Sequence, residues 1–345
     1  MAERIPVTVL TGYLGAGKTT LLNRILSEDH GRRYAVIVNE FGEIGIDNDL
    51  ILNSDEELFE MNNGCICCTV RGDLIRTLHG LLSRKSDFDA IIVETTGLAD
   101  PGPVAQTFFM DPFLQEKTAL DSVTTVIDAC HILMRLHDSR EAVEQVAFAD
   151  QMVLNKAELV TEDELGRIEA RLRRINPLAP VHRAQRANVS LDKVLGRGGF
   201  DLARIVSLEP DFLTPAHGAA GHVHDEHCGH AHDDHHDHDH EHDAGIRSIA
   251  LTCVAPMHGE RIRMWLNALV SSKGADILRA KGIIDVKDES RRLVFQSVHM
   301  LMEGDLQQEW KSGEARYSRL VFIGRNLDEH MLRKGFESCA APAAI

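Results

Sequence analysis

Residues 12–20 read GYLGAGKTT, and no other part of the chain identifies the fold so clearly. They match the eight-residue phosphate-loop pattern, with Gly12, Gly17, Lys18 and Thr19 at the required positions. The glycines let backbone N–H groups curl around phosphate oxygens, the lysine brings positive charge to the β and γ phosphates, and the threonine hydroxyl binds Mg²⁺. We therefore predict a nucleotide site formed by Gly12, Gly15, Ala16, Gly17, Lys18, Thr19 and Thr20.

The segments around this loop alternate between strand and helix patterns. Short apolar, β-branched runs at 7–10, 35–38, 90–94, 122–128 and 151–155 are typical of strands buried on both faces. Helical patterns lie between them, at 18–26, 74–82, 141–149 and, with Thr161 as N-cap and Glu164 completing a capping box, 161–176. This order predicts an α/β fold, a doubly wound and mainly parallel sheet with helices on both faces.

Composition limits the function of the chain. The 345 residues carry a formal net charge of −16, which argues against a nucleic-acid or anionic-membrane partner, since both need a basic surface. No apolar run reaches the ~18 residues that a membrane span requires, and the N-terminus has no apolar signal core. The seven cysteines are not spaced as a disulfide framework, so we expect a reducing, cytoplasmic location.

One segment divides the chain into domains. Residues 217–245 are almost entirely His, Asp, Gly and Ala, with eleven histidines and few apolar side chains to bury. Such a composition cannot offset the entropy of ordering, so it predicts a disordered linker. We therefore expect a nucleotide-binding domain at 1–207, a His/Asp-rich linker at 208–245 and a smaller α+β domain at 246–339.

Further residues complete the predicted nucleotide site. Glu94 ends an apolar strand and is placed to hold the Mg²⁺ water shell, and Gly97 follows where a backbone N–H could contact the γ-phosphate. The run VLNKAEL puts Asn155, Lys156 and Glu158 after another strand, much like the Asn-Lys-x-Asp motif that reads guanine. Glutamate replaces the usual aspartate here. The pattern favours GTP over ATP, with Lys18, Thr19 and Glu94 as the catalytic set.

Three cysteines within NGCICC indicate a metal site. Cys65, Cys67 and Cys68 lack the Cys-x-x-Cys spacing of a redox pair, and no second pair exists to close a structural zinc site. Three thiolates leave a tetrahedral ion one ligand short, which suits an exchangeable site for zinc, or for cobalt or copper. Glu40 and Glu43, in a segment placed to respond to the γ-phosphate, could complete that site in one nucleotide state.

Taken together, these motifs resemble a known family. TGYLGAGKTT, NEFGE, NGCICC, ETTGLADPGPVAQTFF and NKAE, followed by RLVFQSVHML and SRLVFIGRNLD, are similar to the CobW-type P-loop GTPases, and most of all to the zinc-regulated GTPase metalloprotein activators. The resemblance implies GTP hydrolysis coupled to transfer of zinc from the cysteine motif to a client metalloprotein. Some relatives carry a further acid where Val38 stands, so any metal site that uses it lacks a carboxylate here.

Two other functions remain open on the sequence alone. The similar cobalt branch of the family supports cobalamin synthesis, and its proteins also carry His-rich stretches. Alternatively, the thiols and the His/Asp-rich linker could store metal, with the GTPase vestigial. Neutral imidazole binds Zn, Ni, Co and Cu alike, so we interpret the linker as a low-specificity reservoir.

Overall fold

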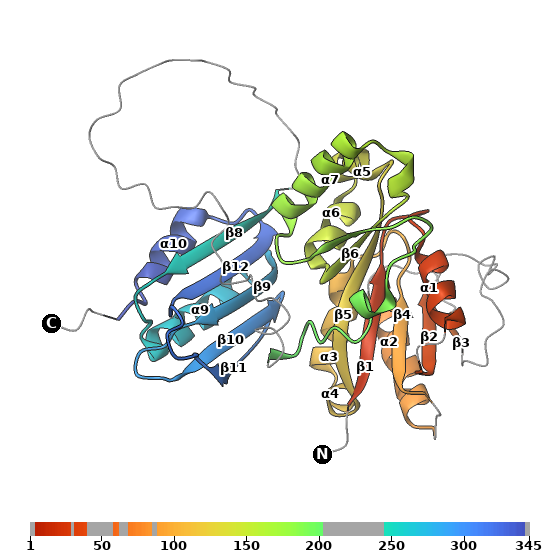
Figure 1. The fold of residues 1–345 in the computed structure, drawn as a ribbon. Coiled ribbons are helices and arrows are strands. Elements are labelled where there is room, and N and C mark those ends of the chain that lie inside the picture. The colour runs from red at the N-terminus through yellow and green to blue at the C-terminus, as the bar shows by residue number, and fades with distance from the viewer. Residues whose placement is uncertain are drawn as a thin grey trace, which may run out of the picture.

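The computed structural model describes residues 4–28, 31–39, 58–61, 68–84, 88–202 and 245–341. They form an N-terminal domain, up to residue 202, and a C-terminal domain, from residue 245, which lie side by side (Figure 1). The His/Asp-rich stretch lies outside the described residues apart from Gly245. The predicted domain boundaries and the disorder of the linker therefore stay predictions.

A seven-stranded sheet with the order β3-β2-β4-β1-β5-β6-β7 forms the centre of the N-terminal domain. All neighbouring strands in it run parallel, which confirms the predicted sheet type. The strands are β1 (Ile5–Thr11), β2 (Tyr34–Asn39), β3 (Leu58–Met61), β4 (Ala90–Glu94), β5 (Thr118–Asp128), β6 (Gln151–Asn155) and β7 (Val181–Arg183).

Helices cover this sheet on both faces, but unequally. Helix α1 and the segment 184–195 pack on one face, and the later helices pack on the other. Alternate residues of one strand therefore enter different cores: Ile91 and Val93 join one, and Ala90 and Ile92 the other. The α-helices are α1 (Lys18–Ser27), α2 (Cys68–Leu82), α3 (Pro101–Met110), α4 (Pro112–Lys117), α5 (Ile132–Asp138), α6 (Arg140–Phe148) and α7 (Glu162–Ile175), with short 3₁₀ turns η2 (Ala157–Leu159) and η3 (Leu191–Lys193).

The C-terminal domain is a five-stranded antiparallel sheet with two helices. Its strands follow the order β11-β10-β9-β12-β8, and the helices pack on one face around Leu266 and Phe336. This arrangement confirms the predicted α+β domain. Its elements are β8 (Ile246–Cys253), α9 (Gly259–Lys273), β9 (Ile277–Ile284), β10 (Arg291–Val298), β11 (Leu301–Glu309), β12 (Ser318–Arg325) and α10 (Glu329–Glu337).

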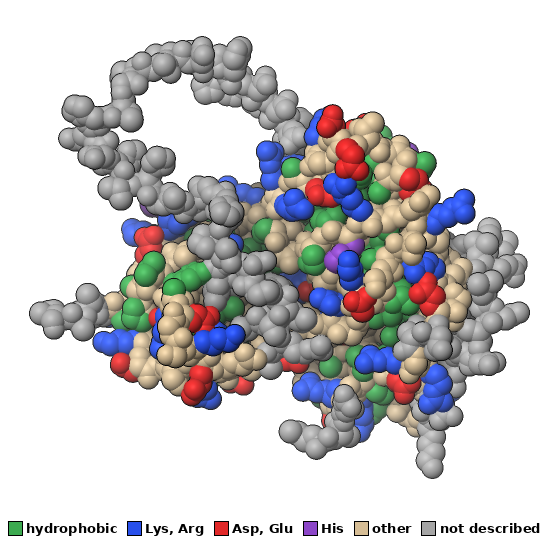
Figure 2. All heavy atoms as spheres, in the orientation of Figure 1, with side chains coloured by type: hydrophobic (Ala, Val, Ile, Leu, Met, Phe, Trp, Pro, Cys, Tyr) green, Lys and Arg blue, Asp and Glu red, His purple; other side chains and the backbone are tan. Residues whose placement is uncertain are grey.

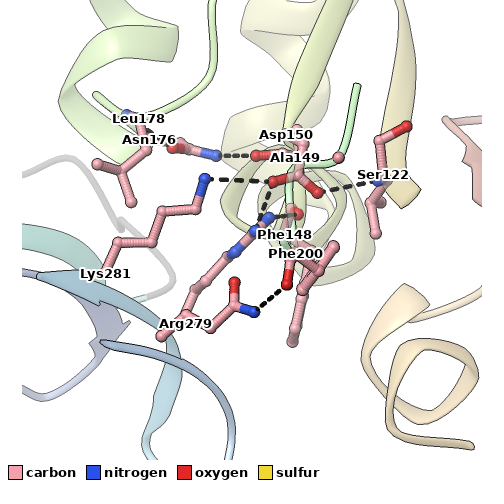
Figure 3. Close-up of polar contacts among 12 residues, drawn as sticks. Ser122, Phe148, Ala149, Asp150, Asn176, Leu178, Phe200, Arg279 and Lys281 are labelled. Carbon is pink, nitrogen blue, oxygen red and sulfur yellow. Dashed lines mark hydrogen bonds and ion pairs between the residues drawn. The ribbon is translucent and has the colours of Figure 1, made fainter. Parts of the chain in front are cut away.

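The other face of this antiparallel sheet packs against the N-terminal domain. Leu278, Val294 and Val321 belong to the same buried apolar cluster as helices α2 to α7, so one hydrophobic core runs across the domain junction. A polar group is buried within the junction: Asp150 receives ion pairs from Arg279 and, at 3.5 Å, from Lys281 (Figure 3). The two domains are therefore joined by apolar packing and by buried charge.

Charge is mixed over the described surface. Figure 2 shows basic and acidic side chains interspersed on the face it presents, with apolar side chains between them. Much of the net negative charge lies elsewhere, because residues 225–243 contain eight acidic and no basic residues. No helix within the described ranges is both long enough and apolar enough to cross a membrane.

Candidate functional site

The phosphate loop lies between the end of β1 and the start of α1, where its glycines are required by close contacts. Gly12 has a φ of 142°, and a Cβ there would lie 2.2 Å from the carbonyl oxygen of Val126. Gly17 has a φ of 106°, and a Cβ there would lie 2.4 Å from Nδ2 of Asn155. Any larger residue would push the loop away from β5 or β6.

Lys18 lies inside the loop that it follows. Its Nζ donates to the carbonyl oxygen of Gly12 at 2.9 Å, and the side chain is only 9% exposed. Thr19 is half-buried in the first turn of α1, and that turn carries no acidic residue. A positive helix end, a buried ammonium group and a hydroxyl therefore converge, which is the chemistry that binds a phosphate chain and its Mg²⁺.

Glu94 lies beside this loop, at the end of β4. In the β1–β4 register it pairs with Leu10, one residue before β1 ends, and it is buried. The next residue, Thr95, donates its backbone N–H to the Leu10 carbonyl at 2.9 Å and its hydroxyl to Thr11 at 2.8 Å. The structure thus brings the predicted Mg²⁺ carboxylate to the same edge of the sheet as the phosphate loop.

The turn that follows Glu94 packs directly against the phosphate loop. A Cβ on Gly97 would lie 2.7 Å from the backbone nitrogen of Leu14. On the other side of the turn, the amide of Gln145 donates to the carbonyl oxygens of Gly97 and Ala99, each at 3.1 Å. Sequence reasoning did not select Gln145. No local signal marked it, because Gln145 stands beside Glu144 in the run AVEQVAF and has the pattern of an ordinary polar position on a helix.

The Asn-Lys-x-Glu motif begins with Asn155, the last residue of β6, and this asparagine connects two loops. Nδ2 of Asn155 donates to the carbonyl of Ala16 at 2.9 Å, and its Oδ1 accepts from the N–H of Ala187 at 2.7 Å. Arg24 of α1 also donates to this second loop, at the carbonyl of Val189, 3.1 Å away. Asn155 therefore fixes the phosphate loop relative to residues 184–189, a segment that the sequence analysis did not include.

Lys156 and Glu158 differ in how they are held. Lys156 has a left-handed backbone with a φ of 60°, and its Nζ donates to Asp128 at 2.7 Å. Burial would raise the pKa of Asp128, but hydrogen bonds from Lys156 and His131 outweigh it and lower the pKa, so the ion pair persists at neutral pH. Glu158 is exposed on turn η2. Of the three residues, Glu158 is the one whose exposed side chain is free to contact the base of a bound nucleotide.

A pocket of about 280 Å³ adjoins these groups. Its lining includes Tyr13 and Gly15 from the phosphate loop, Asp128, Lys156, and Gln145 from α6. The guanidinium of Arg135 lies 5.1 Å from the centre of the Tyr13 ring, which fixes one wall. The pocket thus joins the phosphate loop to the helix that holds the turn after Glu94.

Most of the predicted metal ligands lie outside the described residues. This applies to Glu40, Glu43, Cys65 and Cys67, whereas Cys68 is the first residue of α2, which begins earlier than the predicted 74. Within the described residues, no three His, Cys, Asp or Glu side chains are arranged to hold a metal ion.

The predicted metal ligands follow two strands, β2 and β3, and the ends of these strands are described. Asn39, the last residue of β2, pairs with Met61, the last residue of β3. Val38 pairs with Glu94 on the other side. Since the carboxyl ends of parallel strands share one edge, the Glu40 segment and the cysteine segment both start at the edge that carries the phosphate loop.

Known proteins resemble both domains. Residues 6–183 match the family described as CobW/HypB/UreG, nucleotide-binding domain, and residues 246–340 match the cobalamin synthesis protein cobW C-terminal domain. The zinc chaperone YjiA of Escherichia coli is 35% identical over 96% of this chain and 98% of its own. Zinc-regulated GTPase metalloprotein activator 1 of Dictyostelium discoideum is 30% identical, over 98% of this chain and 80% of its own.

A solved structure shares the whole architecture. The crystal structure of Zn(II)-bound YjiA GTPase from E. coli aligns with a TM-score of 0.75 and 31% identity, covering 98% of this chain and 100% of that one. The similarity therefore includes both domains and their connection in sequence.

Proposed function

This chain belongs to the CobW family of P-loop GTPases, and from that premise we propose that it is a GTP-dependent zinc chaperone. Family membership confirms the predicted resemblance and the GTPase activity. The specific proposal is that zinc binds at Cys65, Cys67 and Cys68 and leaves for a client metalloprotein when GTP is hydrolysed. The relatives named zinc chaperone and zinc-regulated activator support zinc as the cargo.

One observation carries the proposal: the paired ends of β2 and β3 beside Glu94. Because Asn39 and Met61 end at the same level, the segments with Glu40, Glu43 and the cysteines both start next to the nucleotide site. A change in one segment on loss of the γ-phosphate can therefore alter the ligand set of the other. A coupling of metal affinity to nucleotide state needs this proximity.

The catalytic part of the proposal uses positioning and charge neutralisation. We expect Lys18 to offer its ammonium group to the β and γ phosphates, and the Gly97 N–H to contact the γ-phosphate. The Thr19 hydroxyl and the Glu94 carboxylate, an all-oxygen donor set that suits Mg²⁺, would hold this ion, which neutralises developing phosphate charge. The exposed Glu158 would accept from the guanine edge.

Zinc transfer then follows as a population shift. Three thiolates leave one position open, and a carboxylate from Glu40 or Glu43 would fill it while GTP orders that segment. Hydrolysis releases the segment, weakens the site and lets the ion pass to a docked client. By linkage, zinc must change the affinity for nucleotide by the same factor, with a coupling of about 1 to 3 kcal/mol typical of such switches.

The test is a pair of competitive zinc titrations against a chromophoric chelator, one with GDP and one with a non-hydrolysable GTP analogue. We expect zinc affinities that differ about fivefold or more between the two states. Cys67→Ser should remove both the tight site and the difference, and Glu43→Ala should weaken zinc mainly in the GTP state. Zinc bound by the His/Asp-rich segment contributes equally to both titrations.

The matched control is Cys130→Ser, because Cys130 is an exposed cysteine outside the motif. It should leave the difference intact. Equal zinc affinities in both nucleotide states of the wild-type protein would exclude the chaperone mechanism and leave a GTPase that merely carries a metal.

A further inference from the structure

Gln145 of α6 is a buried polar residue with an unusual pair of partners. Its side chain is 1% exposed, and its amide donates to both Gly97 and Ala99 of the turn after Glu94. The backbone carbonyl of Gln145 accepts from the Thr125 hydroxyl at 2.8 Å, so the residue is also fixed to β5. Burying an amide stabilises a protein only if its hydrogen bonds form, so the turn and Gln145 hold each other in one arrangement.

The turn has the phosphate loop on its opposite side. Thr95 bonds to the end of β1, and Gly97 packs on the backbone of Leu14. Between these contacts and Gln145, the Gly97 N–H has little freedom to move without breaking hydrogen bonds. Its position relative to a γ-phosphate therefore depends on where α6 places the Gln145 amide.

Helix α6 is itself held by the C-terminal domain, on both sides of Gln145. One residue before it, the buried carboxylate of Glu144 receives an ion pair from Arg325 at the end of β12. Three residues after it, the carbonyl oxygen of Phe148 accepts from Arg279 of β9 at 2.7 Å (Figure 3).

A third contact from the C-terminal domain reaches the same region. His299, between β10 and β11, packs against the Phe148 ring in a tilted arrangement, with centroids 5.2 Å apart. A Cβ on Gly102, in the first turn of α3, would lie 2.7 Å from Nε2 of this histidine and 2.8 Å from Phe148. The C-terminal domain thus touches α6 and the start of α3, the two helices that border the turn.

We propose that Gln145 is a positioning residue of the GTPase, and that α6 transmits the placement of the C-terminal domain to the turn at residues 95–99. A client or effector that moves the C-terminal domain would then change the response to the γ-phosphate through Glu144, Gln145 and Phe148. This inference rests on the proposed role of Gly97 beside the γ-phosphate.

The experiment compares Gln145→Met with Gln296→Met in the full-length, zinc-free protein. Methionine keeps the side-chain length and removes the amide. Gln296 is a matched control, since it is also buried, at 3% exposed, and donates to a backbone carbonyl, that of Phe200 at 2.7 Å. The readouts are the Kd values for GDP and for a non-hydrolysable GTP analogue, and kcat and KM for GTP.

For Gln145→Met we expect the preference for the GTP analogue over GDP to fall by about fivefold or more, with GDP affinity retained. We also expect kcat to fall roughly tenfold to a hundredfold, because a small misplacement of a charge-stabilising group is costly. Gln296→Met also removes a buried amide, and with it one bond between the domains, but it leaves the donor to the turn in place, so all four quantities should change much less than in Gln145→Met. If Gln145→Met does not fold, Gln145→Leu removes the same donor with an apolar side chain of similar volume, and a loss of discrimination in it has the same meaning.

Arg325→Met tests the transmission from the other domain. Glu144 keeps its second partner, Nε of Arg140 at 2.6 Å, so the carboxylate is not left alone. We expect the same loss of nucleotide discrimination, but smaller.

Wild-type values of kcat and discrimination in the Gln145 variants would overturn the positioning role, and wild-type values in Arg325→Met alone would overturn the transmission. Neither result depends on zinc, so each is distinguishable from a failure of the chaperone proposal.

Discussion

At the scale of single residues, the choice between GTP and ATP depends on which side chains of the Asn-Lys-x-Glu motif can contact the base. Both polar ends of the Asn155 side chain bond to loops of the protein, and Lys156 pairs with Asp128. Glu158, exposed on its turn, is the residue of the motif left to accept from the two donors of the guanine edge, which adenine lacks. Selectivity for GTP should therefore rest on this carboxylate.

The first prediction follows from this. Glu158→Gln should reduce the ratio of kcat/KM for GTP over ATP by about tenfold or more, since an amide opposes one of the guanine donors. Glu158→Asp, the family's usual residue, should keep the ratio near the wild-type value. The measurement is steady-state hydrolysis of both nucleotides. An unchanged ratio in Glu158→Gln would remove the base-reading role from this position.

Single residues also show what the sequence could reveal about the site. Gly12 and Lys18 were identifiable because the phosphate-loop motif fixes their spacing, and Glu94 because it is a carboxylate at the end of an apolar strand. The structure brings all three to one edge of the sheet. Gln145 and the loop at 184–189 were not identifiable, because they meet the site only through long-range contacts. Nothing in the local sequence of α6 marks this glutamine as a partner of a turn 46 residues away.

At the scale of elements, local signals predicted some boundaries well. Helix α7 has the expected N-cap Thr161 with its capping box completed by Glu164, and it ends one residue before the predicted 176. Strands β4 and β6 have the predicted limits, because both are buried on every residue and each has a continuous apolar centre. A few neighbouring residues determine a helix cap or a buried parallel strand, so tertiary context changes these features little.

Other elements were missed or misplaced, for a physical reason. In the C-terminal domain, the run GIIDV at 282–286 predicts a strand that begins at residue 282, whereas β9 spans Ile277–Ile284. Arg279 and Lys281 interrupt the apolar pattern, yet both are buried because they face Asp150 of the other domain. Strands β3, β7 and β11 and helices α3, α4 and α5 were also absent from the prediction. A charged residue buried at a domain junction cannot be distinguished from an exposed one in the sequence.

The end of helix α6 provides a second prediction. Asn176 is fully buried, and its side-chain Nδ2 lies within hydrogen-bonding distance of three carbonyl oxygens at the C-terminal end of α6. These belong to Val146 at 2.8 Å, Ala147 at 3.2 Å and the C-cap residue Ala149 at 2.8 Å. Asn176→Ala should lower the free energy of unfolding by about 2–3 kcal/mol, because buried acceptors lose their donor. Urea unfolding followed by circular dichroism measures this. Asn267→Ala, at an exposed site on α9, is the control and should change stability little.

A third prediction concerns pH and the His299 contact with α6. Burial lowers the pKa of His299 from its ordinary value of 6.5, although the negative charge of Asp100 opposes this. The folded state then binds fewer protons than the unfolded state just below pH 6.5, so stability is full above that pH and is lost as the pH falls toward the folded pKa. Burial acts on the pKa of His182 in the same direction.

Urea unfolding at about pH 7.5 and pH 5.5 should therefore show lower stability at the acidic pH. His299→Gln should reduce this pH dependence, whereas His137→Gln, at an exposed site on α5, should not. An equal dependence in His299→Gln and the wild type would show that this ring is protonated equally in both states.

At the scale of the whole molecule, the two domains should unfold together. One apolar cluster contains residues of both sheets, and Arg279 and Lys281 of β9 are buried against Asp150. The chain has two tryptophans, Trp265 and Trp310, and both lie in the C-terminal domain. Their fluorescence therefore follows that domain, while far-ultraviolet circular dichroism follows both. In the wild-type protein, we expect the two signals to give one coincident urea transition.

Asp150→Ala should separate the transition followed by fluorescence from the transition followed by circular dichroism. It leaves two cations buried at the junction without this carboxylate, and removing one partner of a buried ion pair costs about 3–5 kcal/mol. Asp150 also accepts from the backbone N–H of Val123 at 2.9 Å, so the N-terminal domain loses one buried hydrogen bond, but it keeps its own core around β1 and α1. The larger part of the penalty should therefore fall on docking, and the tryptophan transition should move to lower urea than the circular dichroism transition. Lys281→Met is the control: it leaves Arg279 paired with Asp150, so the transitions should stay coincident. If Asp150→Ala also shows coincident transitions, the apolar packing and the remaining polar contacts, such as Arg325 with Glu144, are enough to join the domains. The coupling between the C-terminal domain and α6 would then depend on shape and not on this buried charge.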